Sequence, residues 1–302
     1  MINLQGWLNV YKPINISSFS AIRKIKKKFN LYKIGHAGTL DPLAEGILPI
    51  AIGKTTKLIS FINNATKEYI FEIKWGEQTS TDDKEGKIIN KSKIIPTIDE
   101  IEFKLKEFKG LIKQIPPKAS AVKINGERAY KLLRSNDKFE LKNKLVYLYS
   151  SKIISDSDHQ ITKIKVECGK GFYIRSLARD LADSLNTKGH IYSLKRIKVG
   201  KFDIKNAILL DDLLKIRQTL QGFRGFYSSV SMLDDILAYE IDDEKEITFL
   251  SQGKSITIDI NKLLNPSLSS IDRKIIFLTN KGSILSFGKL DGNLFKPIKV
   301  LI

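Results

Sequence analysis

Cysteine and histidine are scarce in this 302-residue chain. Cys168 is the single cysteine, which excludes an internal disulfide bond. The three histidines, His36, His159 and His190, are scattered and make no zinc-binding pattern. The sequence therefore predicts chemistry carried by ordinary side chains, without a bound metal ion.

Long hydrophobic runs are also missing. No segment approaches the roughly 18 apolar residues of a membrane helix, and Met1 to Trp7 lacks the basic and apolar regions of a secretory signal. Hydrophobic residues make up 42% of the chain and charged residues 28%, as in a soluble globular protein. We therefore expect a cytoplasmic protein with no membrane contact, and the length favours two domains.

Acidic residues are too few to balance the basic ones. The chain has 51 Lys and Arg against 33 Asp and Glu, a net charge of +18, and its pI is near 9.7. Such an excess favours a polyanion, RNA or DNA, as partner, although the lysine-rich composition of an AT-rich genome would explain part of it. The basic residues clustered at 23–28 accordingly form either a solvated helix face or a helix face that binds phosphates.

The stretch from Lys33 to Pro49 is punctuated by three glycines and two prolines. Such a composition is typical of a loop whose turns aim a few side chains. Two roles are open for Asp41 within it: a turn cap that accepts backbone N–H groups, or a nucleophile or base in a cleft. His36, taken alone, fits a histidine that only makes hydrogen bonds within a loop.

Gly53-Lys54-Thr55 suggests a nucleotide-binding loop. Six residues separate Gly46 from Gly53, whereas the Walker A pattern has four. We therefore exclude a nucleoside triphosphatase.

Periodicity predicts the regular elements. From Tyr69 to Trp75 apolar residues alternate, which places Tyr69 on the buried or cleft-lining face of a strand. Ser17-Ser18 is a good N-cap for the helix that follows. The other expected elements are strands at 7–11 and 161–168, helices at 19–29, 99–108 and 173–185, an acidic linker at about 234–246, and short strands at 255–260, at 275–278 and on both sides of Asp291-Gly292.

The glycine-rich stretch also carries a resemblance. Its residues Gly-His-Ala-Gly-Thr-Leu-Asp-Pro-Leu-Ala-Glu-Gly-Ile-Leu, at 35–48, resemble the signature of the TruB family of tRNA pseudouridine synthases. The resemblance implies that Asp41 is the catalytic nucleophile and that His36 helps to hold a flipped-out base. It also implies an α+β pseudouridine synthase fold with a mixed, mostly antiparallel sheet, plus a small C-terminal all-β, PUA-like domain.

Further segments match other motifs of that family. Lys67-Glu68-Tyr69 implies that Tyr69 stacks on the target base and takes part in proton transfer. The segment 169–177 implies that Arg175 pairs with Asp41, and a neighbouring cation is expected to lower the pKa of that carboxyl. Leu194 lies at the spacing of an apolar wall of the base pocket. The remaining substrate-binding residues implied by the motifs are Tyr173, Lys12 and Lys123.

Three positions depart from the family pattern. Asn15 and Asn186 stand where glycine is usual, and Ala119 stands where an aromatic residue is common. The first two departures concern local turn geometry.

The implied organisation is a catalytic domain over 1–235 and a PUA-like RNA-binding domain over 243–302. A basic arm at about 116–144, with two prolines near its start, is expected to close over RNA. The implied activity is isomerisation of the T-loop uridine of tRNA, position 55, to pseudouridine, without a cofactor. The implied partner is the T-arm stem-loop, bound by a monomer that needs no protein partner.

Two rival functions remain. One is a guide-RNA-dependent synthase that works inside a multiprotein complex, which the arm and the short tail disfavour. The other is a catalytically silent RNA-binding protein, which the joint presence of Asp41, Tyr69 and Arg175 disfavours.

Overall fold

The computed structural model describes residues 4–135, 137–158, 160–217, 220, 222–223, 225–232, 237–264, 275–281 and 283–302. His159 and part of the expected acidic linker, 233–236, lie outside the described residues. The helices are α1 (Ser18–Lys28), α2 (Ile59–Asn64), α3 (Ile98–Glu107), α4 (Ala129–Arg134), α5 (Ile174–Ser184), α6 (Leu210–Lys215) and α7 (Glu244–Ser251), with 3-10 helices η1 (Gly53–Leu58), η2 (Ile204–Asn206) and η3 (Ile260–Lys262).

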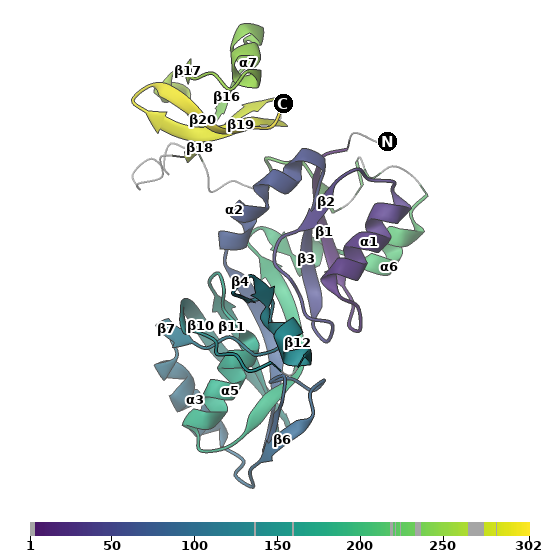
Figure 1. Ribbon diagram of the computed structural model, residues 1–302, viewed down its shortest axis with the longest axis vertical. Helices are drawn as coiled ribbons and strands as arrows, with labels where there is room; N and C mark the ends of the chain where they lie inside the picture. The colour runs from purple at the N-terminus through teal and green to yellow at the C-terminus, as the bar shows by residue number, and fades with distance from the viewer. Residues whose placement is uncertain are drawn as a thin grey trace.

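A mixed sheet forms the centre of the fold (Figure 1). In the described part of the chain it has 11 strands, and its pairings are antiparallel except for β1 with β14 and β12 with β3. This confirms the expected mixed, mostly antiparallel sheet. Its path runs through β14 (Ile208–Leu209), β1 (Gly6–Lys12), β3 (Glu45–Ile52), β12 (Gly189–Val199), β4 (Lys67–Trp75), β11 (Ile161–Cys168), β10 (Lys144–Asp158) and β7 (Gly110–Gln114), with β2 (Ile34–His36), β13 (Phe202–Asp203) and β15 (Phe226–Tyr227) alongside.

The alternation expected at 69–75 is present in β4. Tyr69, Phe71, Ile73 and Trp75 are all buried, while the residues between them are half-buried. The indole Nε1 of Trp75 donates to Thr162 Oγ1 at 2.9 Å on the neighbouring strand β11. Because β4 pairs with both β11 and β12, it fixes the base of the cavity described below.

Helices cover the sheet in two groups (Figure 1). The helix α5 packs on β12, α3 packs on β10, and the two contact each other, whereas α1 and α6 lie together near β1 and β2. Each group turns apolar residues to one continuous core, including Ile25 of α1 and Leu177 of α5. Ser17 caps α1 as expected, since its Oγ accepts from Ser20 N at 3.0 Å.

The two asparagines that replace glycine adopt the glycine conformation. Asn15 has φ of 63° and Asn186 has φ of 54°, and asparagine tolerates this left-handed region better than other side chains do. Asn186 follows the last turn of α5, where Thr187 N donates to Ala182 O at 3.0 Å. The turns that the departures placed in question are therefore formed.

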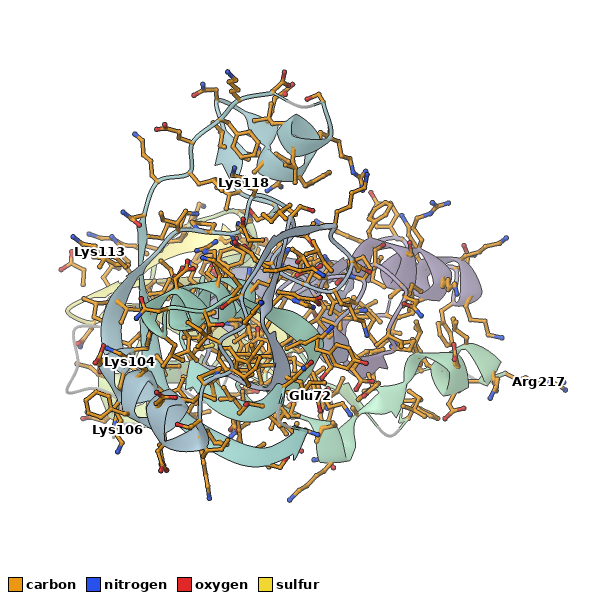
Figure 2. All side chains as sticks on the ribbon, turned by 90° about the horizontal axis from the view of Figure 1, so that it is seen from below. Glu72, Lys104, Lys106, Lys113, Lys118 and Arg217 are labelled. Atoms are coloured by element: carbon orange, nitrogen blue, oxygen red, sulfur yellow. The ribbon has the colours of Figure 1, made fainter. Side chains whose placement is uncertain are left out.

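The arm is a separate projection with its own small elements. It contains the hairpin of β8 (Lys123–Ile124) and β9 (Glu127–Arg128), followed by α4. Figure 2 shows it rising from the body of the molecule, with Lys118 at its base. A second small hairpin, β5 (Glu77–Thr79) with β6 (Ile88–Lys91), follows β4.

The C-terminal part forms a small β-sheet domain. Its sheet order is β16-β18-β19-β20-β17, and the strand β16 comes before residue 243. The expected strand at 255–260 is shorter than predicted, because only Ile256–Thr257 is extended and η3 begins at Ile260. The strands are β16 (Leu237–Glu240), β17 (Ile256–Thr257), β18 (Ile275–Asn280), β19 (Ser283–Asp291) and β20 (Leu294–Val300), with α7 beside them.

This domain docks on η1 and α2. The Phe61 ring lies 5.0 Å from that of Phe277 and 5.1 Å from that of Phe287, both edge to face. Lys57 Nζ donates to Val300 O at 2.9 Å. An apolar cluster thus joins the domain to the chain that follows the Asp41 loop.

Candidate active site

Asp41 lies in the turn between β2 and β3, and the start of the chain pins this turn from one side. Ser18 Oγ donates to Leu40 O and accepts from Leu40 N, both at 2.9 Å. Asn15 N donates to Pro42 O at 2.8 Å. Because the residues before and after Asp41 are both held, the direction of its side chain is fixed by the fold of the loop.

Arg196 of β12 holds the same loop from beneath. Its side chain is 1% exposed, its Nε donates to Ile47 O at 2.7 Å, and its Nη2 donates to Gly38 O at 2.9 Å. Gly38 has φ of 84°, and a Cβ there would lie 3.1 Å from Arg196 Nη1. At Gly46, a Cβ would lie 2.1 Å from Arg196 O. The close approach therefore requires glycine at Gly46, whereas at Gly38 the positive φ is what favours glycine.

Arg175, in the first turn of α5, contacts Asp41 directly. Its Nη2 lies 2.9 Å from Asp41 Oδ2. As a lone arginine it would have been placed on the solvated surface, but its side chain is only 5% exposed. Asp41 Oδ1 has no hydrogen-bond partner among the described residues, and the Asp41 side chain is 37% exposed. The arginine thus fixes one carboxylate oxygen and leaves the other open to the cavity.

A second aspartate, Asp83, completes this ion-pair network. Its Oδ2 lies 3.3 Å from Arg175 Nη1, and its side chain is 3% exposed. Its Oδ1 accepts from Thr81 Oγ1 at 2.6 Å and from Glu85 N at 3.1 Å. Asp83 is not among the residues that the sequence singles out, and the adjacent aspartates in the polar turn after β5 are its only local signal.

Two backbone carbonyls also accept from Arg175. Thr81 O accepts from its Nη1 and Ala119 O from its Nη2, each at 3.0 Å. Ala119 lies in the arm, so a single guanidinium joins the arm, the Asp83 turn and the catalytic loop. The position of the guanidinium beside Asp41 therefore depends on all three segments.

The pKa of Asp41 differs from the expectation. Low solvation in the cavity raises the pKa of this carboxyl above the usual aspartate value; Arg175 offsets part of the rise, and Asp83 adds to it. The expected effect of Arg175 is present, but desolvation outweighs it. A carboxylate with a raised pKa is a stronger nucleophile and base once it is ionised.

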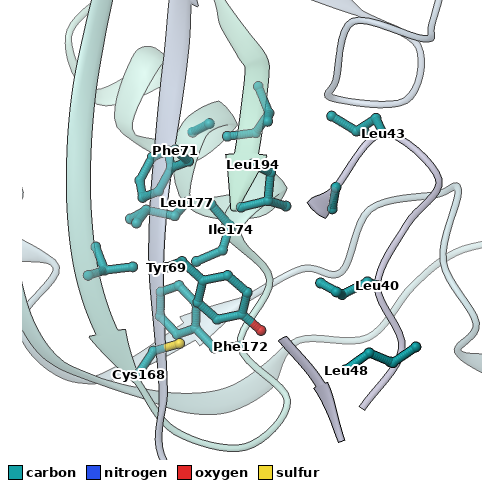
Figure 3. Close-up of a cluster of buried hydrophobic side chains, with 14 of the residues drawn as sticks. Leu40, Leu43, Leu48, Tyr69, Phe71, Cys168, Phe172, Ile174, Leu177 and Leu194 are labelled. Atoms are coloured by element: carbon teal, nitrogen blue, oxygen red, sulfur yellow. The ribbon is translucent and has the colours of Figure 1, made fainter. Parts of the chain in front are cut away.

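Most of the predicted site residues line one cavity of about 430 Å³. Figure 3 shows the apolar side chains around Tyr69, with Leu40 from the loop, Leu194 from β12, and Phe172 and Ile174 at the start of α5. The predicted residues that line the cavity are His36, Asp41, Tyr69, Tyr173, Arg175 and Leu194.

Tyr69 and His36, which line the cavity, also have altered pKa values. Burial raises the pKa of the Tyr69 hydroxyl, and Arg196 opposes that rise. Burial and the charge of Arg196 lower the pKa of His36, which keeps its ring neutral near pH 7. The Nδ1 atom of His36 is buried without a hydrogen-bond partner among the described residues.

Lys12 and Lys123 do not line this cavity. Lys12 is fully buried, and its Nζ donates to Pro13 O at 2.9 Å and to Ile16 O at 2.7 Å. It therefore holds the turn after β1, and its predicted contact with substrate stays a prediction. Lys123 lies exposed on β8 in the arm, where its predicted role stays a prediction.

Cys168 ends β11 and is buried next to this region. Burial raises its pKa to about 12, so it is held as an unreactive thiol. Among the described residues, no group of three His, Cys, Asp or Glu is placed to hold a metal ion. No helix in the described part of the chain is long and apolar enough to cross a membrane.

Family models match most of the chain. Residues 26–174 match the TruB family pseudouridylate synthase N-terminal domain, and residues 175–238 match the tRNA pseudouridylate synthase B C-terminal domain. Among curated relatives, tRNA pseudouridine synthase B of Caulobacter vibrioides is 41% identical over 84% of this chain and 82% of the relative. The protein of the same name from Ehrlichia ruminantium is 38% identical over 98% of this chain and 99% of the relative.

The fold has a solved counterpart. A chain of a structure described as a Cbf5-Nop10-Gar1 complex matches with a TM-score of 0.74 and 24% identity, over 98% of this chain and 85% of that one. The family models define the class of protein, the pseudouridylate synthases. The family matches and the identity to full-length relatives go further: the chain belongs to the TruB family.

Proposed function

We propose that this protein isomerises the T-loop uridine of tRNA, at position 55, to pseudouridine, with Asp41 as the nucleophile. The observation that carries the proposal is the cavity in which Asp41 and Tyr69 lie together, with Arg175 holding one oxygen of Asp41. The related synthases from Caulobacter vibrioides and Ehrlichia ruminantium, named for tRNA, support the choice of substrate.

The target base has to leave the tRNA loop to reach this cavity. Flipping a base out of its stack costs a few kcal/mol, and stacking on an aromatic ring returns about 1–3 kcal/mol. Tyr69 supplies such a ring at the cavity wall, and Leu194 supplies an apolar surface beside it. His36 lines the same cavity, where its ring is placed to contact the bound nucleotide.

Asp41 acts through its free oxygen. With Oδ2 held by Arg175, the ionised carboxylate presents Oδ1 to the nucleotide. The glycosidic bond from N1 to the ribose breaks, the uracil rotates, and C5 bonds to the ribose. The C5 proton then leaves and N1 takes up a proton, so that atoms balance. The overall reaction is an isomerisation, so it consumes no cofactor and no external electrons.

Cations outside the cavity suit the backbone of a folded RNA. The exposed residues of α1 are mostly basic, and none of its cations forms an ion pair within the described residues; they are Arg23, Lys24, Lys26, Lys27 and Lys28. The arm adds the exposed residues Lys118, Lys123 and Arg128. We assign these residues to phosphates of the tRNA T-arm.

The C-terminal β domain is assigned to RNA binding as well. The proposal divides the chain into a catalytic part, about 1–235, and this domain, about 243–302 with β16 added to its sheet. The protein acts as a monomer in the cytoplasm, without a guide RNA or a protein partner.

Tritium release tests this function. Purified protein alone, mixed with tRNA labelled at C5 of uridine, should release tritium from position 55 in a single turnover. A requirement for a guide RNA or added proteins would favour the guide-dependent rival. Tight tRNA binding without any release would favour a silent RNA-binding protein.

A further inference from the structure

One wall of the catalytic cavity carries three cations. Lys67, Lys170 and Arg196 all line it. Among the described residues, none of the three forms an ion pair with a carboxylate, although Asp41 lines the same cavity beside Arg175. The cavity therefore combines an aspartate that is paired with Arg175 and a group of cations that lacks a counter-ion.

Lys67 is the least expected of these cations. It is the first residue of β4 and faces the same side as Tyr69, yet it is only 8% exposed. Its Nζ donates to Asn63 O at 2.8 Å and to Ala65 O at 2.5 Å, the carbonyls at the end of α2. An ammonium has three N–H donors, and the third has no partner within the described ranges.

A helix-capping role explains only part of this arrangement. Lysines that cap a helix C-terminus usually keep their charge in water, whereas burial and the charges of Arg196 and Lys170 lower the pKa of Lys67 to about 8. Holding a cation in such surroundings is costly unless an anion comes near. The cavity wall is thus prepared for an anion that the protein itself does not supply.

We propose that Lys67 and Lys170, backed by Arg196, form a phosphate subsite that binds one of the two phosphodiesters flanking the target uridine. This inference rests on the proposed function, because a flipped nucleotide brings its own phosphates to the cavity. Lys67 lies two residues from Tyr69, roughly 7 Å along the strand, so the base on Tyr69 and a phosphate on Lys67 belong to one nucleotide. Lys170 is exposed at the cavity wall and closes on the same phosphate.

Each partner of the contact can be neutralised separately. The protein variants are Lys67→Gln and Lys170→Gln, and the RNA variants are T-arm hairpins with a neutral methylphosphonate at the 5′ or the 3′ side of the target uridine. Lys91→Gln is the matched control, since Lys91 is 70% exposed on β6 and does not line this cavity. Dissociation constants are measured by filter binding, and thermal melts report folding.

If the subsite exists, the losses of affinity caused by the protein change and by the RNA change should not be additive. Each of Lys67→Gln and Lys170→Gln should weaken binding of the unmodified hairpin about tenfold and reduce the salt slope by about 1. One methylphosphonate position should weaken wild-type binding similarly and then cost little more in either variant. Lys91→Gln should keep the full methylphosphonate effect.

Three results would overturn the subsite. Full additivity of the protein and RNA changes at both phosphates would do so, as would wild-type affinity in both variants. So would a Lys67→Gln protein that binds normally and only turns over slowly, because its ammonium would then act on the base. If Lys67→Gln melts early, Lys170→Gln decides alone, since its exposed side chain caps no helix.

The proposed function is tested apart from the subsite in the same samples. Tritium release from the unmodified hairpin reports chemistry, whereas the methylphosphonate comparison reports binding. Wild-type protein that binds in a phosphate-dependent way and releases no tritium would overturn the function and leave the subsite standing. Tritium release together with additive losses of affinity would overturn the subsite and leave the proposed function standing.

Discussion

Replacing Asp83 with asparagine removes one negative charge from the ion-pair network but keeps the size and shape of the side chain. Asp83→Asn keeps an oxygen that accepts from Thr81 Oγ1 and Glu85 N, but it removes the negative charge 3.3 Å from Arg175 Nη1. Breaking a buried ion pair costs about 3–5 kcal/mol when nothing else compensates. Arg175 retains Asp41 and two backbone carbonyls, so we expect a loss of about 2 kcal/mol of unfolding free energy.

Asp83→Asn should also slow catalysis, because Arg175 would no longer be held in its position beside Asp41. A misplaced guanidinium that costs about 1.4–2.7 kcal/mol of transition-state stabilisation slows the reaction roughly 10- to 100-fold, while tRNA affinity stays within a few-fold of wild type. The pH dependence adds a signed test. Because Asp83 raises the pKa of Asp41, its neutralisation lowers that pKa. The acid side of the pH–rate profile, where Asp41 becomes protonated and activity falls, should therefore move to lower pH.

Single-turnover rates between pH 5 and 8, with a urea unfolding curve, measure both effects. Asp82→Asn is the matched control, because Asp82 lies beside Asp83 but pairs with Arg179 Nη1 at 3.1 Å. Its φ of 59° also suits asparagine. A wild-type rate and an unshifted acid limb in Asp83→Asn would refute the role given to this network.

Three further predictions follow from the same structure. The affinity for tRNA should fall with salt with a log–log slope between roughly −3 and −5, for about five phosphate contacts; filter binding at several salt concentrations measures it, and a slope near zero would contradict the electrostatic argument. Arg196→Lys keeps the charge but loses the fork that holds Gly38 O and Ile47 O, so single-turnover rates should drop at least tenfold with tRNA affinity nearly unchanged; an equal loss of affinity would point to a direct RNA contact. Phe61→Ala and Phe287→Ala should show a coupling of about 0.5–1.5 kcal/mol in urea unfolding, whereas independent effects would mean that the C-terminal domain does not dock on α2.

The catalytic loop could be predicted because its signal is local. Glycines and prolines around Asp41 mark a loop of fixed shape, and strict alternation in β4 places Tyr69 on the buried face. The Ser17 cap of α1 is of the same kind, since it depends on neighbours in the chain. Thr97 and Glu100 form a capping box at α3 that the same reasoning could have found.

The partners of Asp41 could not be predicted from local pattern. Asp83 and Arg196 are far from Asp41 in the sequence, and only the packing of β12 and the β5 turn brings them to the site. Arg175 was placed at the site by resemblance, since a lone arginine in a first helical turn normally faces water. Its burial follows from four acceptors that come from three separate segments.

The C-terminal domain was predicted in outline. The turn at Asp291-Gly292 correctly joins β19 to β20. The acidic composition of 234–246 predicts a linker there, and the strand β16 escapes this reasoning because its pairing with β18 is parallel and distant in the chain. The helix α7 was also missed, because its acidic first turn resembles a linker by composition.

The most direct test of the account is Asp41→Asn. Asparagine keeps the size and the loop contacts of Asp41 but cannot act as the nucleophile, so the variant should fold and bind T-loop RNA within a few-fold of wild type. The measurement is pseudouridine formed per enzyme in a single turnover, with a filter-binding curve and a thermal melt alongside. The account predicts no detectable pseudouridine, and turnover near the wild-type rate would contradict it.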